Sequence, residues 1–547
     1  MIARRTVSLI AAAAMAAGTL LVLSPSRSVH ADSATFDTAQ MLPAAPNLGL
    51  PHNEDGEPGI AQDGGGTIWI ASDVAPYAAD DPRAQTTGVL SGSDVWKSTD
   101  HGKTFQWVAD PFQQSVTNAV ALGGEDTDIA ANPVQNSNGC YDIWVASLWV
   151  GSTSLAVSQD CGVTWNVVPV NGIPAQDRPW LAASGACTVL FSYHAIAPYD
   201  TVVDEFSLPP CTGQGMGSAV SPTETLLFAG NIAPGLSNRF GKLVVDNSPS
   251  SPYQGHIYQP MQGCTAATPG SNTQVPEGCT TAAEIFMGVG TVSGNAITWT
   301  DPVVHTTNST TVYIWPATAA VDTAGNVYIA WMEGPSGYAQ NLFISVSHDG
   351  GAIWTSPVQI NQPPSLSGAY ATVAALSPGT VEAAWYGTDR NGGTDDPSVM
   401  GIPATTANPA CGGTSQPACW RLWWGVSNDY GGSWSEQPVT GTIHTGTLCT
   451  EGGGCGANPG DRNLLDDFGM LIDPQTGGAV ITFTNDQPES VAGKTHTDFI
   501  AQVVPPAGNT PEFGAGGPAL ALLGAGGLAA AGLRRRRSAA NRGRGLG

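Results

Sequence analysis

Short runs of alternating apolar and polar residues, separated by turn residues, recur along most of the chain. The clearest unit reads "ATAAVDTAGNVYIAWMEG" followed by "NLFISVSHDGGAIWTSPVQI". It contains an apolar strand that ends near an Asp, a turn with Gly, an aromatic strand, and a strand that leads into a second turn. Such units begin near Glu57, Asp126, Asp177, Asn238, Thr311, Tyr370 and Asp461. The pattern therefore predicts seven β-sheet units, with six as the alternative.

Repeated four-stranded units of roughly 40 to 50 residues are typical of a β-propeller, which leaves only short, protected sheet edges. The last unit lacks a fourth strand, and residues before Glu57 could supply it and close the ring. The chain has 68 Gly and 16 Trp, a composition that suits short strands and tight turns. We predict an all-β propeller of four-stranded blades over residues 32–505.

The two ends of the chain lie outside this predicted propeller, the body of the protein, and have a different residue pattern. Arg4 and Arg5 precede an apolar run, which is typical of a signal peptide over residues 1–31. Residues 514–533 are apolar and long enough to span a bilayer, and four arginines follow them. We expect a linker over 506–513 and, over 514–547, either a membrane anchor or a tail similar to the cleaved sorting tails of bacterial wall-attached proteins. The body would then be extracellular, at the cell surface.

The net charge and the cysteines of the chain limit the classes of partner and cofactor that it can bind. The chain has 19 Lys+Arg against 44 Asp+Glu, a formal net charge of −25, which excludes a basic nucleic-acid-binding surface. Ten cysteines in an exported chain suggest disulfides, and no spacing fits a zinc site. We predict a monomer without a required cofactor. The preferred cysteine pairs are near neighbours in sequence: Cys140–Cys161, Cys187–Cys211, Cys264–Cys279, Cys411–Cys419 and Cys449–Cys455.

Four segments share the pattern Ser-x-Asp-x-Gly-x-x-aromatic: "STDHGKTF", "SQDCGVTW", "SHDGGAIW" and "SNDYGGSW". They resemble the Asp-box repeat of the sialidase superfamily, and the resemblance covers residues 57–504. It implies that each box lies in the turn between the third and fourth strands of a blade, away from the substrate. Asp100, Asp160, Asp349 and Asp429 are therefore expected to accept hydrogen bonds from turn amides rather than to act in catalysis.

In a propeller, the innermost strand of each blade delivers residues to the mouth of the central channel, so functional residues are sought at the unit starts. The resemblance implies a clamp of three arginines for a substrate carboxylate, a tyrosine nucleophile with a glutamate base, and an aspartate acid/base. Guanidinium groups bind carboxylates in bidentate fashion, and a phenol is a nucleophile that avoids bringing two anions together. The candidates by position are Arg178, Arg239 and Arg462 for the clamp, Tyr370 or Tyr313 for the nucleophile, Glu57 for its base, Asp128 for the acid/base, and Tyr313 with Trp315 for further substrate contacts.

The sequence departs from sialidases in its first inner strand. Sialidases carry Arg-Ile-Pro there, whereas this chain has "EPGIA", with Glu57 before the proline. Two functions therefore stay open: an exo-α-sialidase-type glycoside hydrolase that acts on terminal acidic sugars of extracellular glycans, and a non-catalytic propeller that binds glycan or protein. The acidic phrases "EDTD" and "DRNLLDD" could also hold calcium.

Overall fold

A computed structural model describes most of the predicted body. The described residues are 34–46, 53–74, 92–112, 124, 126–149, 152–168, 176–195, 200–207, 223–226, 239–263, 284–293, 296–306, 311–313, 318–334, 340–403, 417–450, 462–487 and 495–504. The predicted signal peptide, linker and C-terminal tail lie outside them. Within the described ranges, no helix has the length and hydropathy needed to span a membrane.

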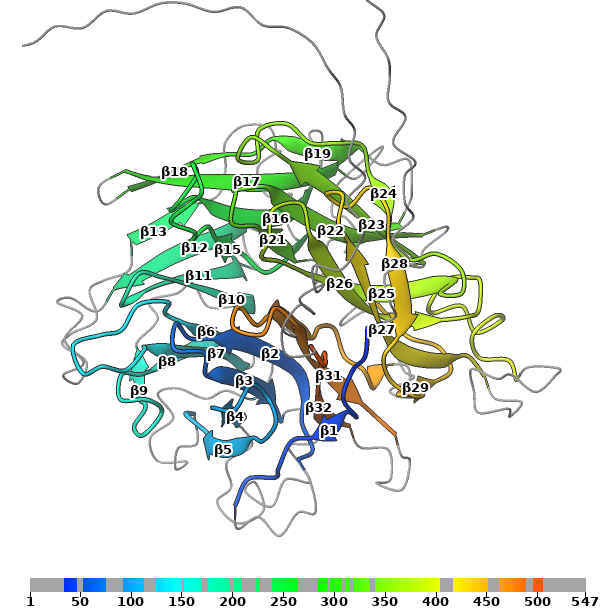
Figure 1. Ribbon diagram of the computed structural model, residues 1–547, viewed down its shortest axis with the longest axis horizontal. Helices are drawn as coiled ribbons and strands as arrows, with labels where there is room; N and C mark the ends of the chain where they lie inside the picture. The colour runs from blue at the N-terminus through cyan, green and yellow to red at the C-terminus, as the bar shows by residue number, and fades with distance from the viewer. Residues whose placement is uncertain are drawn as a thin grey trace, which may run out of the picture. The chain divides into compact units, whose positions relative to one another are not determined.

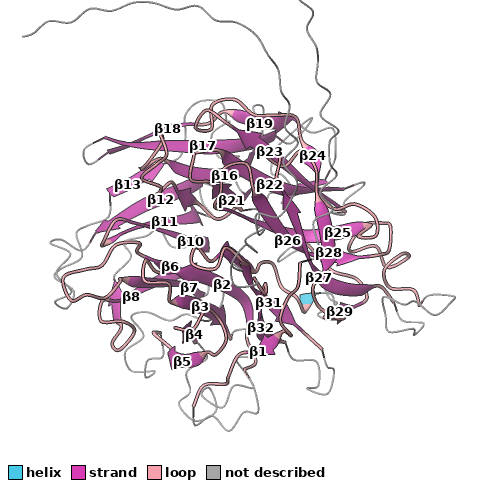
Figure 2. Ribbon diagram, in the orientation of Figure 1, coloured by secondary structure: helices cyan, strands magenta, loops and turns pink. Residues whose placement is uncertain are grey.

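Apart from one short helical turn, the described elements are β-strands, and they form seven hydrogen-bonded sheets (Figure 2). The first three sheets each have four antiparallel strands. They consist of β2 (Gly56–Gln62), β3 (Ile68–Asp73), β4 (Ser93–Ser98) and β5 (Gln106–Ala109); β6 (Thr127–Ala131), β7 (Ile143–Trp149), β8 (Ser152–Ser158) and β9 (Asn166–Val168); and β10 (Gln176–Ser184), β11 (Thr188–Ala195), β12 (Asp200–Ser207) and β13 (Thr223–Leu226).

The other four sheets repeat this order with short additions. They consist of β14 (Arg239–Phe240), β15 (Val244–Val245), β16 (Ile257–Gly263), β17 (Glu284–Ser293), β18 (Ala296–Thr300) and β19 (Val303–Thr306); β20 (Thr311–Tyr313), β21 (Ala319–Val321), β22 (Val327–Gly334), β23 (Asn341–Ser347) and β24 (Val358–Gln359); β25 (Ser367–Ala375), β26 (Val381–Thr388), β27 (Cys419–Ser427), β28 (Ser435–Pro438) and β29 (His444–Thr445); and β30 (Gly469–Ile472), β31 (Ala479–Asn485), β32 (His496–Ala501) and β1 (Gln40–Met41).

The innermost strands form a closed ring. Strands β2, β6, β10, β15, β21, β25 and β30 contact one another in this order, and β30 contacts β2 again. Figure 1 shows the last sheet, with β31 and β32, beside the first sheet, with β2 and β3. The predicted all-β propeller is confirmed, and each of the seven predicted units corresponds to one sheet.

The N-terminal strand closes the ring, as the sequence predicts. Strand β1 pairs antiparallel with β32, with Gln40 opposite Phe499 and Met41 opposite Asp498. The last sheet therefore takes its fourth strand from the beginning of the chain. This arrangement joins both ends of the body in one set of backbone hydrogen bonds and leaves no open gap between the first and last blades.

Two innermost strands are interrupted, which the sequence pattern did not predict. Strands β14 and β15 both pair with β16, and β20 and β21 both pair with β22. Between β14 and β15 the chain leaves the regular ladder, and Lys242 forms an isolated bridge with Thr318 of the next sheet. The interruption therefore places Lys242 between two blades rather than within one.

The apolar core is divided among the interfaces between sheets. Trp144 of β7 packs in one cluster with Phe191 and Tyr193 of β11, and all three side chains are fully buried. Trp96 of β4 and Phe499 of β32 share another cluster between the first and last sheets. Burying a large aromatic side chain contributes about 1.5–3 kcal/mol. Each blade is thus stabilised mainly by apolar contacts with the neighbouring blades. Its position therefore depends on the whole ring.

The four Ser-x-Asp-x-Gly segments all lie between the third and fourth strands of their sheets, as predicted. In the third one, Ser347 Oγ donates to Asp349 Oδ1 at 2.7 Å, and the Gly351 N–H donates to Ser347 Oγ at 2.8 Å. The Ile353 N–H donates to Asp349 Oδ1 at 2.9 Å. Partial burial opposes the change, but these hydrogen bonds together lower the pKa of Asp349. The carboxylate holds the turn in shape.

Strand register places these turns at the end of the blade opposite to the unit starts. In the first sheet, Gly56 pairs with Asp73, which pairs with Ser93, at one end. At the other end Gln62 pairs with Ile68, which pairs with Ser98. Asp100 follows Ser98, so it lies far along the blade from Glu57. The position agrees with a structural role for the repeated aspartates.

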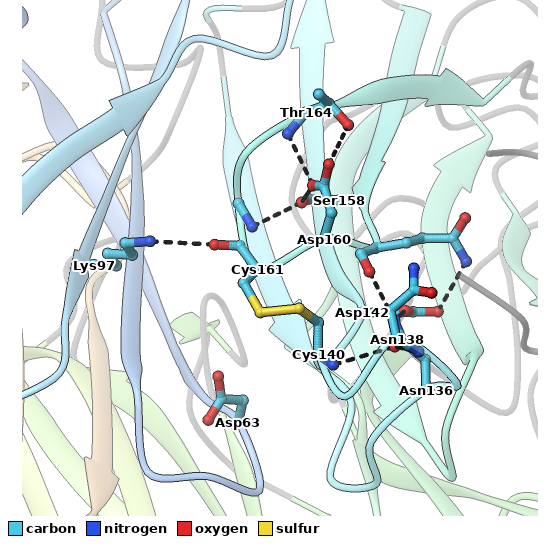
Figure 3. Close-up of a disulfide and its surroundings, with 12 residues drawn as sticks. Asp63, Lys97, Asn136, Asn138, Cys140, Asp142, Ser158, Asp160, Cys161 and Thr164 are labelled. Carbon is cyan, nitrogen blue, oxygen red and sulfur yellow. Dashed lines mark hydrogen bonds between the residues drawn. A yellow bond between two sulfur atoms is a disulfide. The ribbon is translucent and has the colours of Figure 1, made fainter. Parts of the chain in front are cut away.

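One of these turns carries a disulfide, shown in Figure 3. Cys140, before β7, is bonded to Cys161, in the turn after β8 of the same sheet, as predicted. Lys97 of β4 donates from Nζ to the Cys161 carbonyl at 3.2 Å, which ties this turn to the preceding sheet. Cys187, Cys419 and Cys449 are also disulfide-bonded, and their predicted partners lie outside the described residues.

Candidate active site

Three innermost strands carry a bulge whose central residue is not glycine. Glu57 (φ 48°), Arg178 (φ 60°) and Tyr370 (φ 58°) have left-handed backbone conformations, and the strand register shifts at each of them. Leu465, immediately before Asp466, has a φ of 58° as well. Such conformations cost about 1–3 kcal/mol for residues with a side chain and are frequent at functional sites. A bulge turns a side chain away from the regular alternation, here at the start of the innermost strand.

Asp466 lies at the centre of the site and is fully buried. Its Oδ2 accepts hydrogen bonds from an Nη2 atom of Arg178 at 2.5 Å and of Arg462 at 2.6 Å. The Asp466 N–H donates to Glu57 Oε1 at 2.8 Å. Charge-assisted hydrogen bonds of this kind are roughly twice as strong as neutral ones. Asp466 therefore binds side chains from the first, third and last sheets together.

Tyr370 is fully buried beside this aspartate. Its hydroxyl donates to the Cys449 carbonyl at 2.7 Å and lies 3.4 Å from Asp466 Oδ1. Burial, followed by the negative charge of Asp466, raises the pKa of Tyr370 well above its ordinary value. Tyr370 is thus held as a neutral phenol that donates a hydrogen bond.

Two further carboxyl groups of the site have strongly raised pKa values. Burial is the main cause of the raised pKa of Glu57, and the charges of Asp126, Asp73, Asp466 and Asp467 add to it. Burial also raises the pKa of Asp467, with further contributions from neighbouring aspartates and opposition from the charge of Arg178. Closely spaced carboxyl groups in a buried site cannot all ionise, so some of them retain protons near neutral pH.

A cavity of about 140 Å³ lies among the innermost strands, and Asp467, the neighbour of Asp466 in the sequence, contributes to its lining. Its lining comes from all seven sheets and includes Asp128, Trp180, Lys242, Thr318, Thr372 and Asp467. Lys242 Nζ donates to Asp128 Oδ1 at 2.5 Å, and the Leu181 N–H donates to Asp128 Oδ2 at 2.7 Å. Burial raises the pKa of Asp128, although the charge of Lys242 opposes this. Asp467 is the strongly perturbed carboxyl group that faces the cavity.

The structure brings together four of the residues chosen from the sequence. Glu57, Arg178, Arg462 and Tyr370 surround Asp466, while Asp128 lies in the adjoining cavity. No hydrogen bond joins Glu57 to the Tyr370 hydroxyl among the described contacts. Of the remaining candidates, Arg239 in β14 and Tyr313 in β20 are described only in their backbone, and Trp315 lies outside the described residues.

Sequence reasoning noted Asp466 and Asp467 at a unit start, as part of a possible calcium site, but gave them no catalytic or substrate-binding role. Both belong to the phrase "DRNLLDD" at the last unit start, where the sequence does show a concentration of acids. Nothing in that phrase distinguishes a buried acid from a solvated one. Within the described ranges, no three acidic, His or Cys side chains are placed to hold a metal ion. Calcium binding stays a prediction.

Comparisons with known proteins show likeness in structure only. No protein-family model matches the chain, and no curated protein sequence matches it. Among solved structures, it is similar to a protein of unknown function from Dyadobacter fermentans (TM-score 0.42, 13% identity, 86% of this chain and 99% of that one). It is also similar to an α-L-arabinofuranosidase from Fusarium graminearum (TM-score 0.42, 9% identity, 86% and 98%).

A third similar structure is the NanB sialidase from Streptococcus pneumoniae, with a TM-score of 0.38, 9% identity, and coverage of 85% of this chain and 70% of that one. At these identities the likeness concerns the fold alone. The chain is a β-propeller, and the chemistry of its site rests on its own residues.

Proposed function

We propose that this propeller is a glycoside hydrolase that removes a terminal sugar from a glycan. The observation that carries the proposal is the carboxyl cluster at the ring centre, in which Glu57 and Asp467 have strongly raised pKa values beside further carboxylates. Glycoside hydrolysis requires one carboxylic acid that protonates the leaving oxygen and a second group that acts as nucleophile or base. Neighbouring carboxyl groups of unlike protonation supply this pair.

Asp467 is the preferred general acid in this proposal. Its side chain faces the cavity, whereas Glu57 is buried and accepts a hydrogen bond from the Asp466 N–H. Asp126 is the preferred second carboxylate, because 18% of its side chain is exposed and its charge acts on both Glu57 and Asp467. A protonated Asp467 would protonate the leaving oxygen, and the partly exposed carboxylate of Asp126 would act as the nucleophile or base.

A second mechanism follows from the sialidase resemblance. In it, Tyr370 is the nucleophile, Glu57 its base and Asp128 the acid/base, while Arg178, Arg239 and Arg462 hold a substrate carboxylate and Tyr313 and Trp315 contact the sugar. The raised pKa of Tyr370 and its hydrogen bond to the Cys449 carbonyl favour the carboxyl-pair mechanism instead. Tyr370→Phe distinguishes the two, because it abolishes turnover only if the hydroxyl attacks.

The setting of this activity follows from the sequence. We propose that the protein is exported, retained at the cell surface through residues 514–547, and acts on an extracellular glycan. Its excess of acidic residues leaves nucleic acid out as a partner.

The test is turnover of a panel of fluorogenic glycosides by the purified body, covering neutral hexosides and pentosides, uronides and a sialoside. We expect turnover of at least one member and a loss of at least 100-fold in kcat for Asp467→Asn. Glu284→Gln is the matched control, because Glu284 contacts Thr306 in an outer part of its sheet. If no member is hydrolysed, the proposal is wrong, and the non-catalytic binding propeller becomes the better hypothesis.

A further inference from the structure

Asp466 binds both Arg178 and Arg462, two of the three arginines that the sialidase resemblance assigns to a substrate carboxylate. Both guanidinium groups donate to its Oδ2, at 2.5 and 2.6 Å. We propose that the site accepts an uncharged terminal sugar, and that Asp466 is the specificity-determining residue that excludes acidic ones. This inference rests on the proposed hydrolase function and names its substrate class.

The arginine that reaches deepest has its charge engaged within the protein. Arg178 is 4% exposed and binds the fully buried Asp466, and its Nε lies 3.9 Å from Asp126 Oδ2. A substrate carboxylate could reach these guanidinium groups only by displacing a buried carboxylate. Leaving that internal anion without its partners would be strongly unfavourable. The built-in pair therefore competes directly with any acidic sugar.

The surrounding charges also oppose an anion. The charges of Asp126 and Asp466 act on both Glu57 and Asp467, and the charge of the buried Asp73 acts on Glu57 as well. Lys242, the described cation on the cavity side, is bound to Asp128 at 2.5 Å. Because the site is largely buried, each negative charge raises the free energy of binding a further one.

The same groups suit sugar hydroxyls. Ionised carboxylates only accept hydrogen bonds, and a hydroxyl both donates and accepts. A neutral sugar can therefore donate to a carboxylate such as Asp126 and accept from a protonated Asp467 without adding charge to the site. The chemical class that fits is an uncharged hexose or pentose at the end of a glycan.

The experiment compares matched glycosides that differ only in a CH₂OH or a COOH group at C6, glucoside with glucuronide and galactoside with galacturonide, in both anomeric forms, together with a sialoside. We expect wild-type kcat/KM to favour the neutral member by at least tenfold. Asp466→Asn removes, at similar volume, the negative charge that the two guanidinium groups share. It should move the acid-to-neutral ratio of kcat/KM toward the acid by at least tenfold, whereas Glu284→Gln should leave the ratio unchanged.

The outcomes separate this inference from the proposed function. The inference is wrong if the wild type prefers a uronide or the sialoside. It is also wrong if the acid-to-neutral ratio of kcat/KM is unchanged in a folded Asp466→Asn variant. In both cases the hydrolase proposal still stands. If that variant does not fold, inhibition of the wild type by free glucose and by free glucuronate decides, and tighter inhibition by glucuronate overturns the inference. If no glycoside is turned over, the hydrolase proposal fails. Calorimetric titration of the wild type with methyl glucoside and methyl glucuronide then decides whether the site prefers neutral sugars.

Discussion

Arg178 and Asp466 are 288 positions apart in the sequence, yet the Arg178 guanidinium donates to the Asp466 carboxylate at 2.5 Å in the buried centre of the ring. This ion pair joins the third sheet to the segment that precedes β30. Arg462 contributes a second guanidinium to the same oxygen. The contact exists only because the ring closes, so it links the stability of the propeller to the geometry of its site.

Removing the shared carboxylate should destabilise the protein strongly. We expect Asp466→Ala to lower the free energy of unfolding by roughly 3–5 kcal/mol, because two guanidinium groups lose their buried partner. Arg462→Ala should cost less, since 28% of the Arg462 side chain is exposed and Arg178 still pairs with Asp466. Denaturant unfolding of both variants measures the difference. Equal losses would show that the centre does not behave as a buried ion pair.

The turn glycine of the first Ser-x-Asp-x-Gly segment should be hard to replace. Gly102 has a φ of 81°, and a Cβ there would collide with the buried Phe499 ring of the last sheet. Gly477→Ala is the matched control, with a φ of 76° and no atom within 4 Å of the added Cβ. Both variants pay for backbone strain, but Gly102→Ala should lose about 1–3 kcal/mol more through overpacking. Thermal unfolding of the pair tests this, and indistinguishable stabilities would contradict it.

Glu382 should make the protein less stable as the pH rises. Burial raises its pKa from 4.5 to about 7, and its Oε2 accepts a hydrogen bond from Trp424 Nε1 at 2.7 Å. Between these two values the unfolded chain ionises while the folded one stays protonated, so stability falls over that range. Glu382→Gln keeps an acceptor for Trp424 and should raise stability at pH 7 by up to about 3 kcal/mol. Unfolding curves at pH 4 and pH 7 check this, and the gain should vanish at pH 4.

Asp486 should have the opposite pH dependence. Burial opposes the change, but the hydrogen bond of 2.7 Å to His444 Nδ1, with other contacts, lowers the pKa of Asp486. A lowered pKa adds stability above the unfolded value of 3.8, and this is lost as the pH falls through the folded value. Asp486→Asn should therefore be less stable than the wild type at pH 7 and approach it below pH 3. A constant difference across this range would rule out the linkage.

The Cys140–Cys161 disulfide should stabilise the second sheet without affecting the site. It closes a loop with a sequence separation of 21 and lies at the end of the blade opposite to the unit starts. The double variant Cys140→Ala/Cys161→Ala should lose about 2–4 kcal/mol of stability. Glycoside turnover below the melting temperature should be unchanged. A lower kcat in the folded variant would show coupling between the two ends of the propeller.

The amino-acid sequence by itself determined the sheets and their turns. Strand alternation, the aromatic second strands and the Ser-x-Asp-x-Gly segments are local patterns. The hydrogen bonds of Asp349, for example, stay within residues 347–353. The closing strand could also be inferred, since the last unit was one strand short.

Only the tertiary structure shows which residues at the starts of the units come together, and whether these residues are buried and paired. Asp466 looks like any surface acid in "DRNLLDD", and only the closed ring buries it between two arginines. The left-handed conformations of Glu57, Arg178 and Tyr370 have no signal in the sequence, because none of these residues is glycine. Their cause is non-local: packing between blades fixes the bulges, and the bulges direct the side chains. The carboxylate that pairs with Arg178 belongs to Asp466, 288 residues away in the sequence. No local pattern could therefore have shown that this arginine already has a partner within the protein.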